Sequence, residues 1–226
     1  MTFQWVRDQV RQACAAAGRD PSEVRLLPVS KTHPVSALTP LIGLGVTAFA
    51  ENRVQEMAAK AEALAGSGHL VDWVMIGHLQ RNKAAAACSV MSELQSLDSL
   101  DLALALERWY DRVRPEQRLP VLVEVNTSGE DSKSGIPVEE VMDFTARLHG
   151  MEHLRLRGLM TVAHPDPDLA ELGFVALSNL RMALQDRDGG GWPELSMGMS
   201  GDFQRAIARG ATCVRIGTAI FGARGS

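Results

Sequence analysis

Lys31 stands where an apolar, strand-like segment ends. The residues before it read Leu26-Leu27-Pro28-Val29-Ser30, and a proline-containing loop follows through Pro34. A lysine at the end of a buried strand lies against apolar walls, and desolvation there disfavours its charged form. The neutral amine is the form that attacks a carbonyl to make an imine. Taken alone, Lys31 is better interpreted as a solvated lysine just past a strand end.

Residues near the carboxyl terminus have the chemistry of a phosphate cup. Ser196-Met197-Gly198-Met199-Ser200 places hydroxyls and a glycine directly before a predicted helix, whose first N–H groups attract an anion. Gly217-Thr218 follows the last predicted strand and offers a second hydroxyl beside a glycine. In the alternative interpretation, Ser200 only caps its helix and the glycines only form turns.

The elements that must position these groups alternate between strand and helix. Eight segments show the continuous apolar pattern of strands buried on both faces: 24–30, 46–49, 72–76, 92–97, 119–126, 154–161, 194–197 and 212–216. Helical patterns separate them at 35–42, 52–64, 79–87, 100–113, from Pro137 onward, 169–185 and 200–209, the last capped by Ser200. An amphipathic helix over 2–17, ended by Gly18, precedes the first strand.

Eight strand–helix units predict an α/β fold, a (β/α)₈ TIM barrel, whose typical size is about 250 residues. An open, doubly wound sheet is the alternative, but eight units favour closure. The chain of 226 residues carries no internal repeat and no linker, so we expect one barrel domain over 1–226 with an extra N-terminal helix.

Composition excludes several classes of function. The formal net charge is -4 and no lysine/arginine block is long enough for a nucleic-acid interface. Cys14, Cys88 and Cys213 are widely spaced without a CxxC pair, which indicates free thiols in a reducing compartment. No apolar run is long enough to span a bilayer, and the first residues lack the apolar core of a signal peptide. We therefore expect a cytoplasmic protein.

The amine and the phosphate cup belong to one site if the barrel closes. Active sites of such barrels lie at the carboxyl ends of the strands, with phosphate commonly bound after strands seven and eight. Lys31 after the first strand then faces Gly217-Thr218 after the last, and a ligand that carries an aldehyde and a phosphate satisfies both. Pyridoxal phosphate is the obvious candidate. Arg215 could reach its ring nitrogen and keep it unprotonated, or form an outward salt bridge on the barrel wall.

Seven segments together resemble the pyridoxal phosphate homeostasis protein family, and the resemblance runs essentially end to end. They are Val29–Thr32, Glu51–Glu56, Ile76–Lys83, Ser132–Gly135, Leu156–Met160, Leu195–Ser200 and Val214–Gly222.

The resemblance implies a barrel like the N-terminal domain of alanine racemase, with pyridoxal 5'-phosphate held as an imine on Lys31. Asn52 matches the asparagine that lies near the cofactor ring, and Arg215 matches the arginine at the ring nitrogen. The phosphate-binding positions of the family are matched by Ser200, Gly217 and Thr218. Two residues near those positions are matched by Ser196 and Met197.

The sequence departs from the family pattern at three positions. Gly201 stands where the family usually has aspartate, which removes a carboxylate close to the phosphate loop and loosens the helix start. Ala50 replaces a common glycine, and Arg53 replaces the usual tyrosine. The changes at 50 and 53 concern loop detail more than chemistry, whereas Gly201 could alter helix stability or phosphate affinity.

The function implied by the resemblance is pyridoxal phosphate homeostasis: a carrier that holds the cofactor at Lys31 and releases or transfers it to acceptor enzymes, without efficient turnover. We expect this carrier to be a monomer. The alternative is a racemase-like enzyme, which needs acid/base groups on both faces of the substrate carbon. In alanine racemase the second base is a tyrosine of another domain, supplied by a partner subunit. This chain has one tyrosine, Tyr110, inside a predicted helix, which favours the carrier.

The remaining polar residues receive simpler interpretations. His149 and His153 have metal-like spacing, but Gly150 between them indicates an exposed helix end, so we expect no metal site. His33, His78 and His164 follow strands and could line the mouth. The resemblance makes Ser132–Gly135 a functional loop near the cofactor, with a mobile polar loop as the alternative. Glu124 and Asn126 could be polar groups of the barrel interior, with no assigned role.

Overall fold

Eight parallel strands form the centre of the computed structural model, which describes residues 2–130 and 133–222. In sheet order they are β1 (Arg25–Pro28), β9 (Cys213–Ile216), β8 (Glu194–Ser196), β7 (Leu154–Met160), β5 (Leu119–Asn126), β4 (Met91–Leu97), β3 (Asp72–Met75) and β2 (Ala48–Glu51). The two-residue strand β6 (Ile136–Pro137) pairs only with β5.

The ends of this sheet meet just beyond β1. Val29 bridges Ala50 of β2 in parallel register, and the Ser30 N–H donates to the Ala50 carbonyl at 3.0 Å. The two edge strands of the sheet are therefore joined at the carboxyl end of β1, directly before Lys31. The prediction of a (β/α)₈ barrel is confirmed, and the open doubly wound sheet is excluded.

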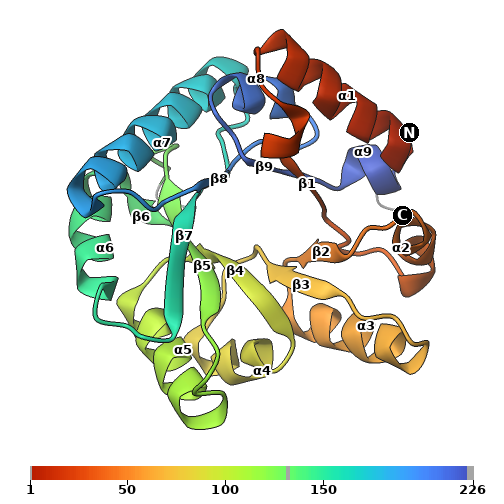
Figure 1. Cartoon of the computed structure of the whole chain (residues 1–226), viewed down its shortest axis with the longest axis horizontal. Helices are drawn as coiled ribbons and strands as arrows, with labels where there is room; N and C mark the ends of the chain where they lie inside the picture. The colour runs from red at the N-terminus through yellow and green to blue at the C-terminus, as the bar shows by residue number, and fades with distance from the viewer. Residues whose placement is uncertain (1, 131–132, 223–226) are drawn as a thin grey trace.

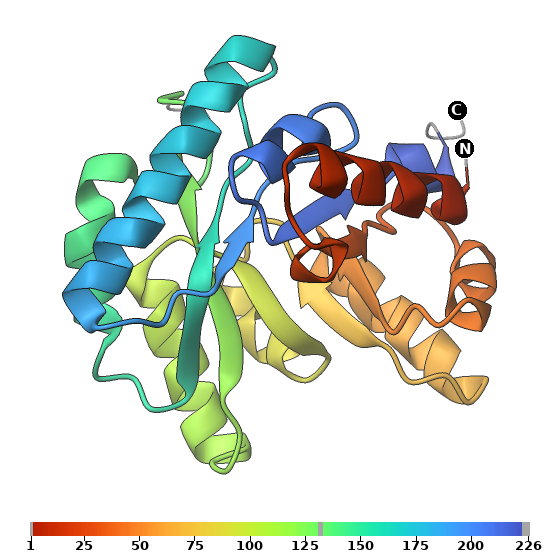
Figure 2. The same ribbon diagram turned by 45° about the horizontal axis from the view of Figure 1, so that its top comes forward.

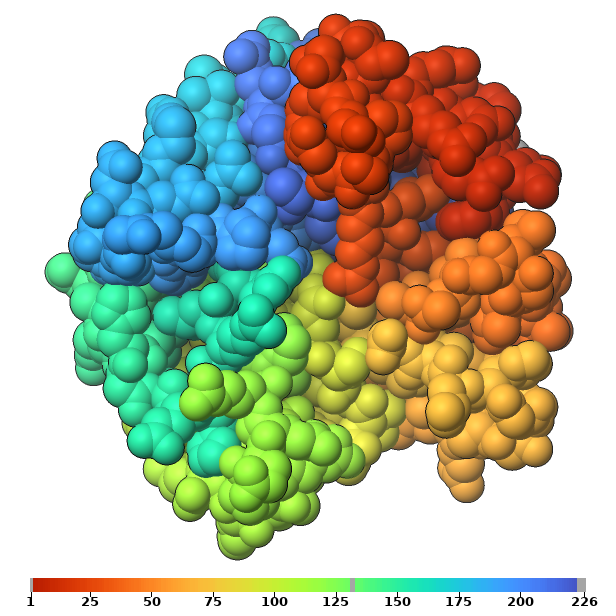
Figure 3. Space-filling view, viewed as in Figure 1, coloured from red at the N-terminus to blue at the C-terminus, as the bar shows by residue number. Residues whose placement is uncertain are grey.

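Helices surround the strands (Figure 1). Their bounds are α1 (Phe3–Ala16), α2 (Thr39–Gly43), α3 (Val54–Gly66), α4 (Ala84–Cys88), α5 (Leu100–Val113), α6 (Val141–Leu148), α7 (Pro167–Asp188), α8 (Phe203–Ala208) and α9 (Thr218–Phe221). The extra N-terminal helix α1 packs against α8 and α9, so the first helix lies beside the last two helices of the chain (Figure 2). In the space-filling view the colours follow one another around the rim, and red meets blue at the top (Figure 3). Within the described residues no helix has the length and apolar character needed to cross a membrane.

The best-predicted elements are those in which pattern and capping agree. In α5 the Ser99 hydroxyl accepts from the Leu102 N–H, and the buried residues Leu102, Leu106 and Tyr110 recur every four positions along one face. In β5, Val121, Val123 and Val125 pack in the large core cluster. Because strand side chains alternate, Leu122 and Glu124 face the barrel interior.

Four helix predictions need correction. The segment 35–42 is a 3₁₀ turn over Val35–Ala37 followed by α2, and 79–87 is a 3₁₀ turn over Arg81–Lys83 followed by α4. Pro137 does not begin a helix. Gly135 at φ +115 brings the chain against the Asn126 main chain, so Ile136 pairs with Val125 and α6 starts later. The predicted cap Ser200 is also wrong, because α8 begins at Phe203 after Asp202. Helix α9 was not predicted.

Candidate functional site

A cavity of about 390 Å³ opens at the carboxyl ends of the strands. Its walls come from loops after β1, β2, β3, β7, β8 and β9. The lining residues are Val29, Lys31, Thr32, His33, Asn52, Ile76, Val162, Met199, Ser200, Gly201, Arg215, Gly217, Thr218 and Gly222. Six of the eight residues predicted for the site therefore meet in one cavity. Ser196 and Met197 do not line it.

Lys31 is half-buried and directly follows the point where the barrel closes. Among the described residues no carboxylate lies within ion-pair distance of its amine. The neighbouring His33 also lines the cavity and stacks on Phe221, with ring centroids 5.1 Å apart. This confirms that His33 borders the mouth and leaves Lys31 as an accessible primary amine inside it.

Arg215 lies on the cavity floor and points into the barrel. It is only 3% exposed, and burial lowers the pKa of its guanidinium from the ordinary value. Its Nη1 donates to the Ser196 hydroxyl and its Nη2 to the Thr161 carbonyl, both at 2.7 Å. The outward salt bridge considered from the sequence is excluded, and two hydrogen bonds fix the plane of the guanidinium instead.

The Ser196 hydroxyl continues a hydrogen-bonded chain through the barrel interior. It donates to Gln95 Oε1 at 2.6 Å, and Gln95 Nε2 donates to Glu93 Oε1 at 2.5 Å. Glu93 also pairs with Arg25 near the start of β1, at 2.6 Å. Ser196 therefore positions Arg215 rather than contacting the cavity. Sequence reasoning missed Gln95, although a polar residue inside the predicted strand 92–97 was a signal.

The predicted phosphate positions gather at one end of the cavity. Ser200, Gly201, Gly217 and Thr218 all line it. None of the hydrogen bonds among the described residues uses the main-chain N–H of Ser200, Gly201 or Thr218. These N–H groups and the two hydroxyls leave several donors available for an anion.

Ser200 joins the two loops of this cup instead of capping α8. Its hydroxyl accepts from the Ala219 N–H at 3.3 Å, while Asp202 Oδ1 accepts from the Met199 N–H at 2.6 Å. The carboxylate of Asp202 stabilises the turn before α8, which is why the helix begins later than predicted. Gly201 borders the cavity, and a Cβ added there would meet no atom within 4 Å.

Met197 directly follows β8 and is fully buried in the large core cluster. The adjacent Gly198 has φ +93, and a Cβ there would lie 2.6 Å from Ala206 Cβ. These residues fix the path of the loop against α8. Their effect on the cavity is indirect.

Asn52 borders the cavity after β2, and its Oδ1 is buried without a hydrogen-bond donor among the described residues. A Cβ on Gly77 would lie 2.4 Å from the Asn52 carbonyl oxygen, so only glycine allows the loop after β3 to approach this closely. Asn52 therefore offers an unpaired acceptor to a ligand.

Glu124 is a buried carboxyl inside the barrel, as the sequence interpretation allowed. It is 6% exposed and its Oε2 has no donor among the described residues. Burial, reinforced by the charge of Asp98, raises its pKa to about 7, while Arg215 and His78 oppose the shift. Its neighbours His78 and Asp98 form a pair at 2.6 Å that does not line the cavity.

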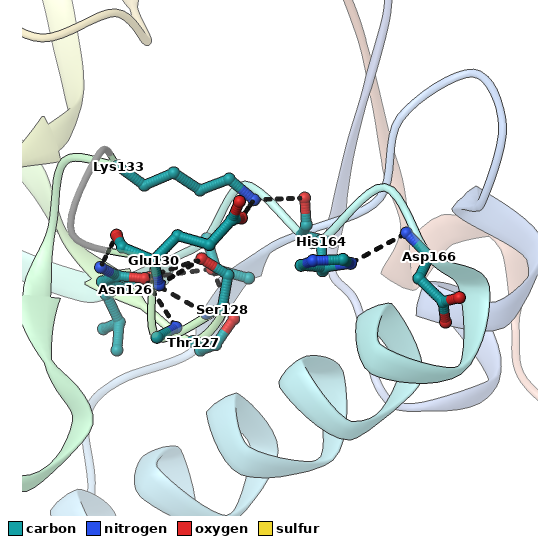
Figure 4. Close-up of polar contacts among 11 residues, drawn as sticks. Asn126, Thr127, Ser128, Glu130, Lys133, His164 and Asp166 are labelled. Carbon is teal, nitrogen blue, oxygen red and sulfur yellow. Dashed lines mark hydrogen bonds and ion pairs between the residues drawn. The ribbon is translucent and has the colours of Figure 1, made fainter.

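Asn126 organises the loop after β5 rather than the barrel interior (Figure 4). Its Oδ1 accepts from the N–H groups of Ser128 and Gly129, both at 3.2 Å, and its Nδ2 donates to the Glu130 carbonyl at 2.9 Å. Lys133 pairs with Glu130 at 2.6 Å and donates to the Ala163 carbonyl at 3.3 Å. The loop therefore contacts the segment that carries Val162 of the cavity wall. Ser132 of the predicted motif lies outside the described residues.

The other histidines have structural contacts. The His164 Nδ1 accepts from the Asp166 N–H at 2.9 Å at the start of α7 (Figure 4). His149 directly follows α6. His153 lies beyond that helix end, where its ring contacts the Gln117 carbonyl at 3.3 Å. The described residues hold no group of three or more potential ligands that could bind a metal ion.

Comparison with known proteins finds relatives over almost the whole chain. Residues 4–225 match the family model described as alanine racemase, N-terminal domain. The pyridoxal phosphate homeostasis protein of Pasteurella multocida is 40% identical over 227 residues, which cover 97% of this chain and 94% of the relative.

Two solved structures are informative. PipY of Synechococcus elongatus, solved with pyridoxal phosphate bound, is 30% identical and superposes with a TM-score of 0.81, covering 94% of this chain and 100% of PipY. The alanine racemase of Corynebacterium glutamicum is 20% identical with a TM-score of 0.69, covering all of this chain and 63% of the racemase. The second likeness concerns the fold alone.

Proposed function

This chain belongs to the pyridoxal phosphate homeostasis protein family, and from that premise we propose that its barrel mouth binds pyridoxal 5'-phosphate at Lys31. We propose further that it releases or transfers the cofactor to acceptor enzymes in the cytoplasm without turning over a substrate efficiently. The observation that carries the proposal is the meeting of Lys31, Arg215 and the phosphate cup in one cavity of about 390 Å³.

The residues present fit the cofactor. Pyridoxal phosphate supplies an aldehyde that condenses reversibly with a primary amine, an aromatic ring nitrogen and a phosphate dianion. Lys31 supplies the amine, and Ser200, Gly217 and Thr218 would hold the phosphate. The buried Asn52 Oδ1 has no donor within the described part of the chain, as expected of an acceptor reserved for a ligand.

Arg215 favours binding over catalysis. Its guanidinium stays charged and is fixed by Ser196 and Thr161, so near a ring nitrogen it can only donate a hydrogen bond. A ring nitrogen that remains unprotonated withdraws electrons less strongly from a bound amine. The arrangement would therefore hold the cofactor without activating it strongly.

A racemase-like activity remains the alternative because the fold is shared with alanine racemase. The position of Tyr110 speaks against it. This tyrosine is buried in α5, outside the barrel, and packs edge-on against Trp109 with ring centroids 5.0 Å apart. Burial also raises its pKa to about 12, so the phenol stays protonated near neutral pH and cannot accept a proton.

The experiment is an absorbance spectrum of the purified protein with and without added pyridoxal phosphate, followed by borohydride reduction and peptide mapping. We expect a visible band that reduction removes and a label fixed on Lys31, with none on Lys60 or Lys133. A protein that stays colourless and takes up no cofactor contradicts the proposal. Racemisation by the loaded protein, well above the rate with free cofactor, would favour the enzyme instead.

A further inference from the structure

The main chain next to Lys31 is strained. Thr32 has φ +68, and besides Trp192 it is the one non-glycine residue in the described part of the chain with a positive φ. A β-branched residue in this conformation is a genuine outlier and persists only where surrounding contacts hold it. The strain lies one residue beyond the proposed attachment amine.

Besides the main-chain hydrogen bonds from Ser30 N–H to the Ala50 carbonyl and from His33 N–H to the Ser30 carbonyl, side-chain hydrogen bonds hold the residues on either side of Lys31. After it, the Thr32 N–H donates to Glu56 Oε1 at 2.6 Å. Before it, the Ser30 carbonyl accepts from Lys60 Nζ at 2.7 Å. The Ser30 hydroxyl also donates to Glu51 Oε1 at 2.6 Å.

Lys60 joins these contacts into one network. It lies on the inner face of α3, is 6% exposed, and directs its ammonium group to three acceptors. These are the Ser30 carbonyl, Glu51 Oε1 at 2.6 Å and Glu56 Oε1 at 2.8 Å. An ammonium group has three donors, so its capacity is used completely. One buried cation therefore links the two supports of the Lys31 loop.

We propose that Glu56 and Lys60 of α3 are positioning residues for Lys31: together they clamp Ser30 and Thr32 so that the amine between them stays inside the cavity. Neither residue lines the cavity, so they act through the main chain. The inference rests on the proposed function only in taking Lys31 as the attachment residue.

A purely structural role for the network makes a different prediction. If Glu56 and Lys60 only anchor α3 to β2, their loss lowers global stability and leaves the Lys31 loop unchanged in the folded protein. If they clamp the loop, the loss of Glu56 affects Thr32 and the reactivity of Lys31 in protein that remains folded.

The first measurement is amide hydrogen exchange at Thr32 in the cofactor-free protein. Glu56→Ala removes the acceptor of the Thr32 N–H, and we expect exchange there to accelerate about tenfold or more. Glu56→Gln keeps an oxygen acceptor and should stay closer to the original rate. The control is Glu62→Ala, which removes an exposed carboxylate of the same helix that makes no hydrogen bond among the described residues. It should not change the exchange at Thr32.

The second measurement is the rate at which added pyridoxal phosphate becomes attached to Lys31, trapped by borohydride at successive times. We expect Glu56→Ala to slow attachment about tenfold and Glu62→Ala to leave it unchanged. Lys60→Met should slow it at least as much, where the variant folds. If Lys60→Met does not fold, Glu56→Ala still tests the clamp, because Lys60 then keeps its pair with Glu51.

A double-mutant cycle with Thr32→Gly tests the strain directly. Glycine adopts positive φ without steric penalty, so Glu56→Ala should slow attachment less in the Thr32→Gly background than in the original protein. Unchanged exchange at Thr32 and unchanged attachment in Glu56→Ala would overturn the clamp. Faster exchange in a protein that takes up no cofactor would support the clamp and overturn the proposed function. Cofactor that attaches to Lys31 at the same rate with and without Glu56 would support the proposed function and overturn the clamp.

Discussion

Arg215 donates from Nη1 to the hydroxyl of Ser196 at 2.7 Å, within the barrel and below the cavity. The hydroxyl in turn donates to Gln95, so Ser196 lies between a charged donor and an amide acceptor. This relationship assigns Ser196 to the support of the guanidinium and leaves phosphate binding to the residues that line the cavity. Loss of the Ser196 hydroxyl should therefore reduce the stability of the protein, because Arg215, Ser196 and Gln95 are all buried.

Ser196→Ala should lower the free energy of unfolding by about 1–3 kcal/mol, because it leaves Arg215 Nη1 and Gln95 Oε1 buried without these partners. Urea denaturation measures the change. The control Ser67→Ala removes a hydroxyl near the exposed end of α3, where it bonds only to neighbouring carbonyls, and should change stability by less than about 0.5 kcal/mol. Equal effects of the two substitutions would refute the supporting role of Ser196.

Gly77→Ala should destabilise the protein by about 1–3 kcal/mol, since the new Cβ would lie 2.4 Å from the Asn52 carbonyl oxygen and main chain cannot move aside easily. Gly43→Ala is the matched control, because a Cβ there meets nothing within 4 Å and its φ is not positive. We expect Gly43→Ala to stabilise by about 0.4–1 kcal/mol through the unfolded chain. Thermal unfolding of both variants checks the pair, and a tolerated alanine at 77 contradicts the close approach.

The sequence predicted the parts of the site that follow from strand ends. Lys31 and Arg215 lie where the barrel topology must place them, one after β1 and the other at the end of its neighbour β9. Local pattern was enough, because apolar strands and their order determine which loops meet. The seven-segment resemblance then narrowed the chemistry to one cofactor.

Contacts between distant segments could not be predicted in this way. The hydroxyl of Ser200 resembles a helix cap in sequence, and only the approach of α9 shows that its partner is the Ala219 N–H. The burial of Lys60 could not be predicted from the sequence either, because a lysine on a helix is normally solvated. The pair with Glu56 has the i,i+4 spacing of a helix ion pair, but no local pattern relates Lys60 to its other two acceptors, Ser30 after β1 and Glu51 of β2.

Lys31→Ala should abolish the visible band and the borohydride label completely while leaving a weaker, phosphate-anchored binding of the cofactor. The reason is that Ser200, Gly217 and Thr218 remain in place when the amine is lost. Equilibrium dialysis with pyridoxal phosphate measures the residual binding, and competition by inorganic phosphate tests its anchor. Lys83→Ala, a lysine away from the cavity, serves as control and should keep the band. A band that persists in Lys31→Ala rejects this residue as the attachment point.

Glu124 should give the protein a pH-dependent stability. Burial raises its pKa from the ordinary value of 4.5 to about 7 in the folded protein. Between these values the folded state binds more protons than the unfolded state, so stability falls as pH rises. The contribution is fully present below about pH 4.5 and is lost through about pH 7. The shift corresponds to a loss on the order of 3 kcal/mol.

Glu124→Gln separates this effect from other titrations, because the amide keeps the shape of the protonated carboxyl and does not ionise. Urea denaturation of both proteins should give similar stabilities near pH 4.5, where Glu124 is protonated in the folded state. Near pH 8 the variant should be more stable than the original protein by up to about 3 kcal/mol, since it has no buried carboxylate to form. The difference should grow steadily between those pH values. Parallel stability profiles across the range would show that Glu124 ionises as easily in the folded barrel as in the unfolded chain, and its neighbours Arg215 and His78 would then offset its burial.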